Sequence, residues 1–293
     1  MHRQPNGLAG AAAGVAAGAA AEARPAASLP SGLDDRYQRL RAWLEEAGSV
    51  VVAFSGGTDS ALVLKVAHDV LGEKAIGVTA SSPSLPKSEL EEARSLAREI
   101  GARHEVIESH EMDDPRYREN TSARCYFCKG DLYGRLVPYA EQRGYAWIVD
   151  GTNLDDTGDH RPGRQAASEH GVRSPLLEAG LTKQDVRDLS RALGLRTWDK
   201  PAAACLSSRI PHGIAVQPEL LARIEQAESF VRSFGIRQLR VRHHGAVARI
   251  EIDPADFPIL LEHRALVAEK LKSLGYRFVS LDIEGFRSGS LNR

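Results

Sequence analysis

The feature that most constrains the fold is the segment SGGTDS at residues 55–60. It follows an apolar run at residues 50–54 and precedes an apolar-periodic stretch at residues 61–71, which predicts a buried strand, a glycine turn and a helix start. Gly56 and Gly57 let the backbone turn sharply and approach an anion without interference from a Cβ atom. The next amides lie at a helix N-terminus, where free N–H groups and the helix dipole favour negative charge. The segment therefore predicts an anion-binding loop.

The side chains of this loop favour a pyrophosphate-like ligand accompanied by a cation. Ser55 and Ser60 add hydroxyl donors, whereas Asp59 suits an anion site only if a further hydroxyl or a cation joins it, which suggests Mg²⁺. The loop is neither a Walker A loop, which needs GxxxxGK[ST], nor a dinucleotide fingerprint, which needs GxGxxG. The pattern SGGxDS resembles the PP-loop of ATP pyrophosphatases, and this resemblance implies that the chain splits ATP into AMP and pyrophosphate. The alternative is a Ser/Gly turn that only caps a helix.

Composition limits the class of protein. The chain has 293 residues, of which 42% are hydrophobic, enough for one large or two medium globular domains. Its net charge of -1 gives no basic field for nucleic acid, and no run approaches the ~20 apolar residues of a membrane span, so we expect neither partner. Three cysteines are too few and odd in number for a disulfide framework, so we expect free thiols and a cytoplasmic location.

The chain is expected to have three parts. Residues 1–32 are rich in Ala and Gly and predict a disordered tail, with a secretory signal as the alternative. Residues 33–204 alternate strands with helices, which predicts an α/β domain with a doubly wound parallel sheet, and the PP-loop resemblance implies the adenine nucleotide alpha hydrolase-like (HUP) type. Residues 205–293 predict a smaller α+β domain for substrate binding or oligomerisation.

The expected elements place the polar loops at one edge of the parallel sheet. Ligands bind beyond the carboxyl ends of such strands, so the loops after Phe54, Ala80 and Asp150 should share one crevice. The expected strands are residues 50–54, 75–80, 103–107, 147–150, 238–242, 248–252 and 277–282. The expected helices are residues 35–47, 61–71, 88–100 with Ser88 as cap, 131–143, 182–193 with Thr182 as cap, 217–234 and 257–274.

The third of these loops carries the sequence GTNLDD. In the PP-loop enzymes a GTN loop lies beside the nucleotide, so Gly151 and Asn153 are predicted to bind it together with the phosphate loop. The alternative is an ordinary Asn/Asp turn.

The cysteines leave four interpretations open. Cys125 and Cys128 form a CxxC, and Cys205 lies on a distant loop, so three thiolates could hold a [4Fe–4S] cluster with one iron open for sulfide. A structural zinc site would need a fourth ligand, for which His212 is available. The CxxC could instead be a redox pair with Cys205 as a reactive thiol near Arg209, or all three could be buried structural cysteines.

Two arginines on one predicted strand suggest a second anion site. Arg240 and Arg242 are two residues apart, so both side chains point to one face and could bind phosphate. Glu228, near the end of the preceding helix, could face the same place. The alternative is a solvated strand face.

The ordered motifs resemble the LarE family of ATP-dependent sulfur transferases within the PP-loop group. The motifs are SGGTDS, CYFCK, GTNLDD, RPG, R-SPL, KPAAACLSSRIP and LRVRHHG, and the resemblance covers residues 34–293. It implies adenylation of a carboxylate of pyridinium-3,5-biscarboxylic acid mononucleotide and exchange of its oxygen for sulfur, in synthesis of the nickel-pincer cofactor of lactate racemase. It also implies a homo-oligomer and possible handover to other enzymes of that synthesis.

The resemblance also implies roles for individual residues. Asp59 and Cys205 would be catalytic, with Cys205 at the sulfur-donating position. The CxxC places the chain with the members that use three cysteines and a [4Fe–4S] cluster. Glu228 matches a metal-binding carboxylate. The positions that match the site of the substrate phosphate are Ser208, Arg209, Arg240 and Arg242.

Two other functions remain open from the sequence. A tRNA thiolase also combines SGGxDS with three cysteines, although no RNA-binding module is evident. A non-enzymatic nucleotide-binding regulator would keep bound ATP intact.

Overall fold

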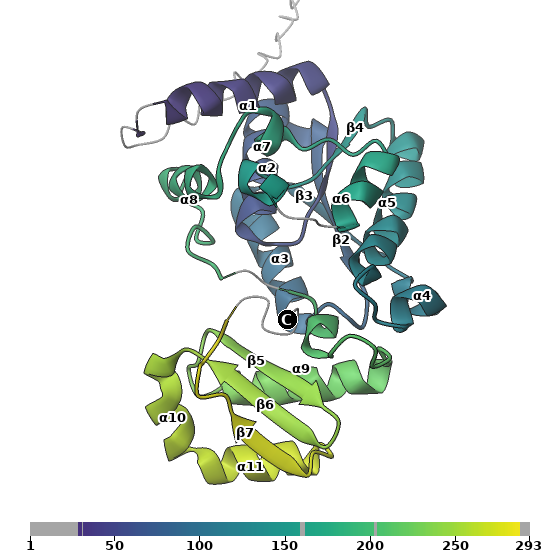
Figure 1. Ribbon diagram of the computed structural model, residues 1–293. Helices are drawn as coiled ribbons and strands as arrows, with labels where there is room; N and C mark the ends of the chain where they lie inside the picture. The colour runs from purple at the N-terminus through teal and green to yellow at the C-terminus, as the bar shows by residue number, and fades with distance from the viewer. Residues whose placement is uncertain (1–28, 31, 159–161, 202–203, 288–293) are drawn as a thin grey trace, which may run out of the picture.

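The computed structural model describes residues 29–30, 32–158, 162–201 and 204–287, which form two units with one sheet each (Figure 1). The first sheet is fully parallel, in the order β3-β2-β1-β4. Its strands are β1 (Val50–Ala53), β2 (Ala75–Ser81), β3 (Arg103–Glu108) and β4 (Trp147–Val149). The predicted α/β class with a parallel sheet is confirmed. The predicted tail lies mostly outside the described residues.

Helices cover both faces of the parallel sheet (Figure 1). Val50 and Val52 of β1 pack against α1, α2, α3 and α8, whereas Val51 packs against α5 and α6 on the other face. Strands buried on both faces are uniformly apolar, which explains the valine run before the phosphate loop. The helices of this unit are α1 (Leu33–Ala47), α2 (Thr58–Leu71), α3 (Lys87–Ile100), α4 (Pro115–Arg118), α5 (Arg124–Arg143), α6 (Pro162–Glu169), α7 (Pro175–Glu178) and α8 (Lys183–Ala192).

The start of α5 and the cap of α3 differ from the sequence-based expectation, whereas the cap of α8 is confirmed. Helix α5 begins at Arg124 rather than at residue 131, so the CxxC lies in a helix and not in a loop. Helix α3 begins at Lys87 with Pro86 as its N-cap, so the predicted Ser88 cap is wrong. The predicted Thr182 cap of α8 is present, within a capping box.

The second unit is a small α+β layer. Its sheet has the order β5-β6-β7, with β5 antiparallel and β7 parallel to β6. The predicted helix over residues 257–274 is two helices that meet at His263. Of the helices in the described residues, none has the length and apolarity that crossing a membrane requires. The elements are α9 (Pro218–Arg232), β5 (Leu239–His244), β6 (Val247–Ile252), α10 (Phe257–Glu262), α11 (Arg264–Ser273) and β7 (Phe278–Leu281).

Gly56 is needed both for its backbone conformation and for its packing. Its φ is +69°, and an added Cβ would lie 3.0 Å from the Ala93 Cβ and 3.1 Å from the Ala93 Cα on α3. Gly144 has a similar φ of +73°, but a Cβ there would meet nothing within 4 Å. Alanine substitutions at the two glycines would therefore separate the free-energy cost of a left-handed backbone from the cost of a clash with Ala93.

We expect Gly144→Ala to lower the free energy of unfolding by about 1 kcal/mol, the usual cost of a left-handed non-glycine residue. Gly56→Ala should lower it by about 2–3 kcal/mol, because α3 must also shift. Urea unfolding of both variants measures the difference. Equal losses would contradict the proposed role of the α3 contact.

Candidate active site

A cavity of about 490 Å³ lies at the carboxyl ends of β1 and β2. As expected, it is lined by the loops that follow Phe54 and Ala80. The loop after Asp150 reaches the same place, because the Asn153 Nδ2 donates to the Asp59 Oδ1 at 3.1 Å. The parallel sheet thus brings the three predicted loops together.

The phosphate loop is held in shape by its own serines. The Ser55 and Ser60 hydroxyl oxygens lie 3.1 Å apart, and the Ser55 N–H points to the Ser60 Oγ at 3.3 Å. Gly151 packs directly against the start of α2, where an added Cβ would lie 2.8 Å from the Ser60 nitrogen. Gly57 is the N-cap of α2 and has no side-chain cap, so a bound anion has access to the helix amides.

Asp59 has a cationic partner that the sequence did not indicate. The Lys183 Nζ lies 2.8 and 2.5 Å from the two Asp59 carboxylate oxygens. Lys183 directly follows the Thr182 cap. Its position at the start of α8, beside the ligand-binding edge of the sheet, could have indicated from the sequence that it lies in the site. The cation that we expected beside Asp59 is therefore, in this structure, a lysine.

A second missed lysine connects the loop to α3. The Lys200 Nζ donates to the Gly56 carbonyl at 3.2 Å and pairs with Glu89 at 2.8 Å and Glu92 at 3.0 Å. Lys200 also lines both the first cavity and a second cavity of about 880 Å³ between the two units. In the sequence, the position of Lys200 as the first residue of the KPAAAC motif could have indicated that it lies in the site.

All three cysteines are free and line the first cavity. Burial, together with the nearby Cys205 and Glu111, raises the pKa of the Cys128 thiol to about 12. The neighbouring Lys129 also lines the cavity, and the pKa of its ammonium is raised by Tyr133, Cys128, Asp150 and Cys125. A free Cys128 is therefore protonated at neutral pH, unlike the activated thiol of a redox CxxC.

Within the part of the chain that the structure describes, no three His, Cys, Asp or Glu side chains are arranged around a single metal ion. This arrangement does not favour the four-ligand zinc site that would have used His212. A [4Fe–4S] cluster differs from a single ion, because each of the three thiolates would bind a different iron.

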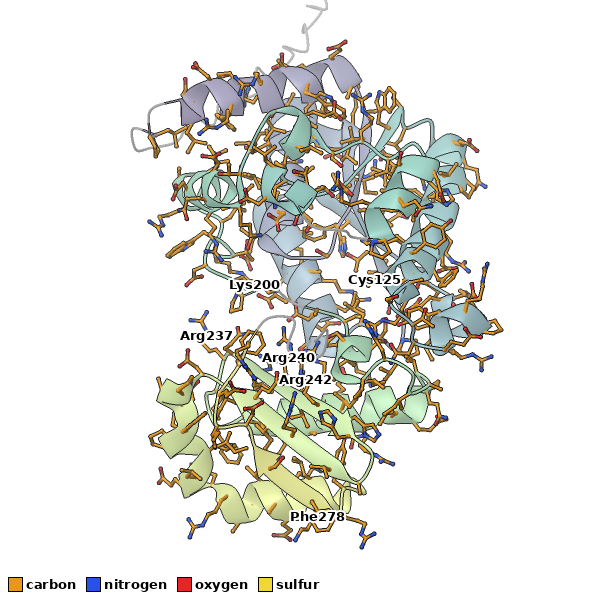
Figure 2. The ribbon with its side chains drawn as sticks, in the orientation of Figure 1. Cys125, Lys200, Arg237, Arg240, Arg242 and Phe278 are labelled. Atoms are coloured by element: carbon orange, nitrogen blue, oxygen red, sulfur yellow. The ribbon has the colours of Figure 1, made fainter. Side chains whose placement is uncertain are left out.

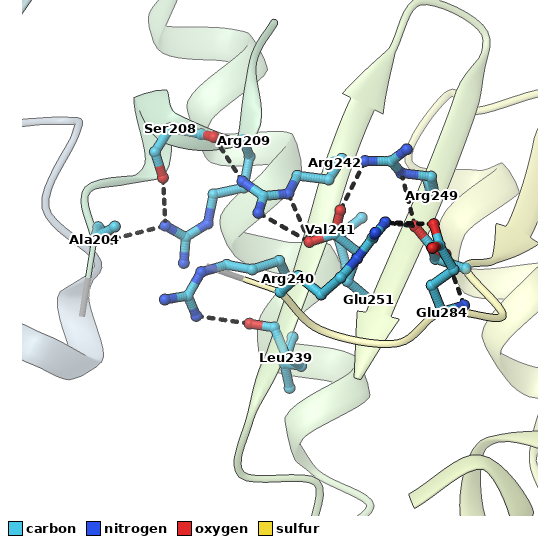
Figure 3. Close-up of polar contacts among 12 residues, drawn as sticks. Ala204, Ser208, Arg209, Leu239, Arg240, Val241, Arg242, Arg249, Glu251 and Glu284 are labelled. Atoms are coloured by element: carbon cyan, nitrogen blue, oxygen red, sulfur yellow. Dashed lines mark hydrogen bonds and ion pairs between the residues drawn. The ribbon is translucent and has the colours of Figure 1, made fainter. Parts of the chain in front are cut away.

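The predicted phosphate-binding residues gather below this cavity, where the second unit begins (Figures 2 and 3). Arg209, in the turn at Leu206–Arg209, pairs with Glu228 of α9 at 2.8 Å and donates to the Ser208 Oγ at 3.0 Å. Arg242 of β5 pairs with Glu251 at 2.8 Å and donates to the Ser208 carbonyl at 2.7 Å. The five predicted residues Ser208, Arg209, Glu228, Arg240 and Arg242 are therefore brought together.

The two β5 arginines have different surroundings. Arg240 lines the second cavity with Arg209 and Glu228, whereas Arg242 is not among its lining residues. Burial and the nearby Arg209 lower the pKa of Arg240 to about 10, and an anion in this cavity would favour its charged form. Arg242 instead completes a buried ion pair inside the second unit.

In this structure the Glu228 carboxylate binds Arg209. Both carboxylate oxygens bond to Arg209, at 2.8 and 3.0 Å, and the first also accepts from the Val241 N–H at 3.0 Å. Its metal-binding role stays a prediction, as do the ligand roles of the cysteines.

Comparison with known proteins agrees with this geometry. Residues 34–139 match the family described as NAD synthase. The chain is 42% identical to the pyridinium-3,5-bisthiocarboxylic acid mononucleotide synthase of Lactiplantibacillus plantarum, over 86% of this chain and 92% of that protein. It is 45% identical to the uncharacterized protein slr1717 of Synechocystis, over 89% of this chain and 98% of that protein.

A tRNA sulfurtransferase is a more distant relative. The probable enzyme of Methanobrevibacter smithii is 22% identical over 65% of this chain and 51% of its own length. The higher identity and coverage of the Lactiplantibacillus protein favour the family predicted from the motifs over the tRNA thiolases. The chain belongs to the LarE family of PP-loop enzymes.

Proposed function

We propose that the chain is an ATP-dependent sulfur transferase that adenylates a carboxylate of pyridinium-3,5-biscarboxylic acid mononucleotide and converts it to a thiocarboxylate. The observation that carries this proposal is that one cavity is lined by the phosphate loop and by all three cysteines. Its residues Lys200, Pro201 and Ala204 also line the cavity that contains Arg209 and Arg240. Nucleotide, sulfur and substrate phosphate can thus be held side by side.

Adenylation is needed because a carboxylate oxygen is a poor leaving group. The substrate carboxylate attacks the ATP α-phosphorus, the bond to the pyrophosphate oxygen breaks, and the acid becomes an acyl adenylate with AMP as its leaving group. The loop amides and Lys183 are placed to bind the departing pyrophosphate. Asp59 is the carboxylate of the loop and would hold Mg²⁺, which would offset the phosphate charge.

Sulfur transfer requires an anionic sulfur nucleophile. The sulfur attacks the acyl carbon, a C–S bond forms, and the C–O bond to AMP breaks. The thiols of Cys125, Cys128 and Cys205 line one cavity and suit a [4Fe–4S] cluster, which when bound would leave one iron open for a sulfide. The cationic Lys129 in the same wall favours negative charge on sulfur.

The second cavity, which Arg209 and Arg240 line, would position the substrate. Arg240 and Arg209 would bind the phosphate of the mononucleotide, so that its ring extends past Ala204 into the first cavity. The protein would act in the cytoplasm as a homo-oligomer and would pass its product to other enzymes of nickel-pincer synthesis.

We expect Asp59→Asn to reduce AMP formation at least about 100-fold, because the loop loses its charged partner for Lys183 and the metal. Pyrophosphate release from ATP, measured with the mononucleotide and Mg²⁺, gives the rate. Asp69→Asn is the control, since Asp69 lies on the same helix and only pairs with Lys65 at 2.6 Å. Full activity of the Asp59 variant would contradict the proposed role.

We expect Cys205→Ala to abolish thiocarboxylate formation while AMP still forms, because the adenylation groups are untouched. Cys125→Ala separates the two sulfur sources, since a cluster needs all three thiolates whereas donation from Cys205 alone does not need Cys125. Iron content after anaerobic purification, product analysis and the protein mass after turnover report the result. A colourless, iron-free protein with sustained turnover would rule out the cluster.

The two β5 arginines should respond differently to substitution. Arg240→Ala should raise the Michaelis constant for the mononucleotide about 10-fold or more, with the value for ATP unchanged, because it removes a phosphate contact. Arg242→Ala should instead lower the free energy of unfolding by about 3 kcal/mol, because it breaks a buried ion pair with Glu251. Steady-state kinetics and urea unfolding of both variants check this, and interchanged effects would contradict the assignment.

A further inference from the structure

Glu111 is a buried carboxylate surrounded by serine hydroxyls. Only 1% of the residue is exposed, yet it lines the first cavity together with its hydroxyl partners. The hydroxyl of Ser84 donates to it at 2.8 Å, and those of Ser82 and Ser109 also donate to it. The four residues Ser82, Ser84, Ser109 and Glu111, here called the serine cradle, are not used in the mechanism above.

Among the described residues of the cavity wall, Glu111 of the serine cradle is the carboxylate without an ion-pair partner. The other two described carboxylates are paired, Asp59 with Lys183 and Glu89 with Lys200. None of the ion pairs among the described residues includes Glu111. A buried carboxylate held only by neutral donors is costly, and a cation beside it would offset that cost.

The serine cradle lies next to the sulfur chemistry. The Ser84 carbonyl accepts from the Leu206 N–H at 2.8 Å, which ties the cradle to the residue after Cys205. Glu111, Cys125, Cys128 and Cys205 also line the same cavity. A cation held by Glu111 would therefore lie in the cavity that the cysteines and the phosphate loop share.

We propose that Glu111 recognises the positively charged pyridinium ring of the substrate. This inference rests on the proposed function, since it names the group that binds the ring of that substrate. Mg²⁺ fits the cradle poorly, because it prefers six oxygen ligands in an octahedron, whereas the cradle offers one carboxylate to which the three serine hydroxyls already donate. A flat organic cation needs only one carboxylate, and the hydroxyl donors hold that carboxylate in place.

Charge also orients the ring. The pyridinium nitrogen carries the positive charge, whereas the acid groups at positions 3 and 5 are negative. Glu111 attracts the first and repels the others, so the reacting carboxylate points away from Glu111 and toward the bound ATP. The same residue thus selects the ring and orients its carboxylates away from Glu111.

Ring charge can be tested directly on the wild-type protein. Nicotinic acid mononucleotide and its 1,4-dihydro form have nearly the same shape, but only the first has a cationic ring. We expect calorimetry to show at least about 10-fold tighter binding of the cationic form. Equal affinities would overturn the proposal, and this measurement does not depend on any variant folding correctly.

Substitution tests the residue. Glu111→Gln should abolish this preference and raise the Michaelis constant for pyridinium-3,5-biscarboxylic acid mononucleotide about 10-fold or more, with that for ATP unchanged. Glu108→Gln is the matched control, because Glu108 is exposed at the end of β3 and outside the cavity lining. An unchanged constant in the Glu111 variant would overturn the proposal, as would an effect confined to ATP or to the Mg²⁺ requirement.

The proposed function fails by a different result. If the wild-type protein forms no AMP with the mononucleotide, the proposed reaction is wrong, whatever the ring preference. If AMP forms and the Glu111 variant behaves like the wild type, only this inference is wrong.

Discussion

The close backbone contact between the start of α2 and its neighbours is the constraint on which the site depends. An added Cβ at Gly151 would lie 2.8 Å from the Ser60 nitrogen, and one at Gly56 would lie 3.0 Å from the Ala93 Cβ. These two close approaches fit the phosphate loop between the β4 loop and α3, where its residues line the cavity. Once the loop is placed in this way, Asp59 meets both Asn153 and Lys183.

The segment around Cys205 joins the two units in a single site. Leu206 bonds to Ser84 of the first unit, while Arg209 pairs with Glu228 of the second. Cys205 directly precedes the first of these attachments, and it lines the nucleotide cavity. A substrate phosphate held by the second unit and a nucleotide held by the first would therefore meet at the sulfur.

Local patterns predicted the order of strands and helices but not the contacts between distant residues. The valine run and the glycine turn identified β1 and the phosphate loop, because burial on both faces and a left-handed turn leave clear traces in sequence. The predicted helix over residues 131–143 left the CxxC outside it, whereas α5 packs against α4 and α6 and begins at Arg124. The Lys183–Asp59 pair spans 124 residues and leaves no local pattern.

The arginines of β5 also show that a local sequence pattern does not reveal contacts between distant residues. Alternation along the strand correctly placed Arg240 and Arg242 on one face, which the structure buries. It could not say which of them faces a cavity, because that depends on the neighbouring strand. Glu251 is the register partner of Arg240 and forms an ion pair with Arg242, which lies diagonally across the two strands, while Arg240 lines the second cavity.

The charges of the first cavity suggest an order for the reaction. Lys183 and Lys200 are each held by a carboxylate, so phosphate groups must replace existing ion pairs rather than fill bare cationic sites. Each phosphate contact therefore has to compensate for the carboxylate contact that it displaces, and a bound Mg²⁺ would offset the charge of the released carboxylates. Meanwhile the raised pKa of Cys128 keeps an unligated thiol protonated and unreactive. The acyl adenylate must form before sulfur attacks, since only then does the reacting carbon have a good leaving group.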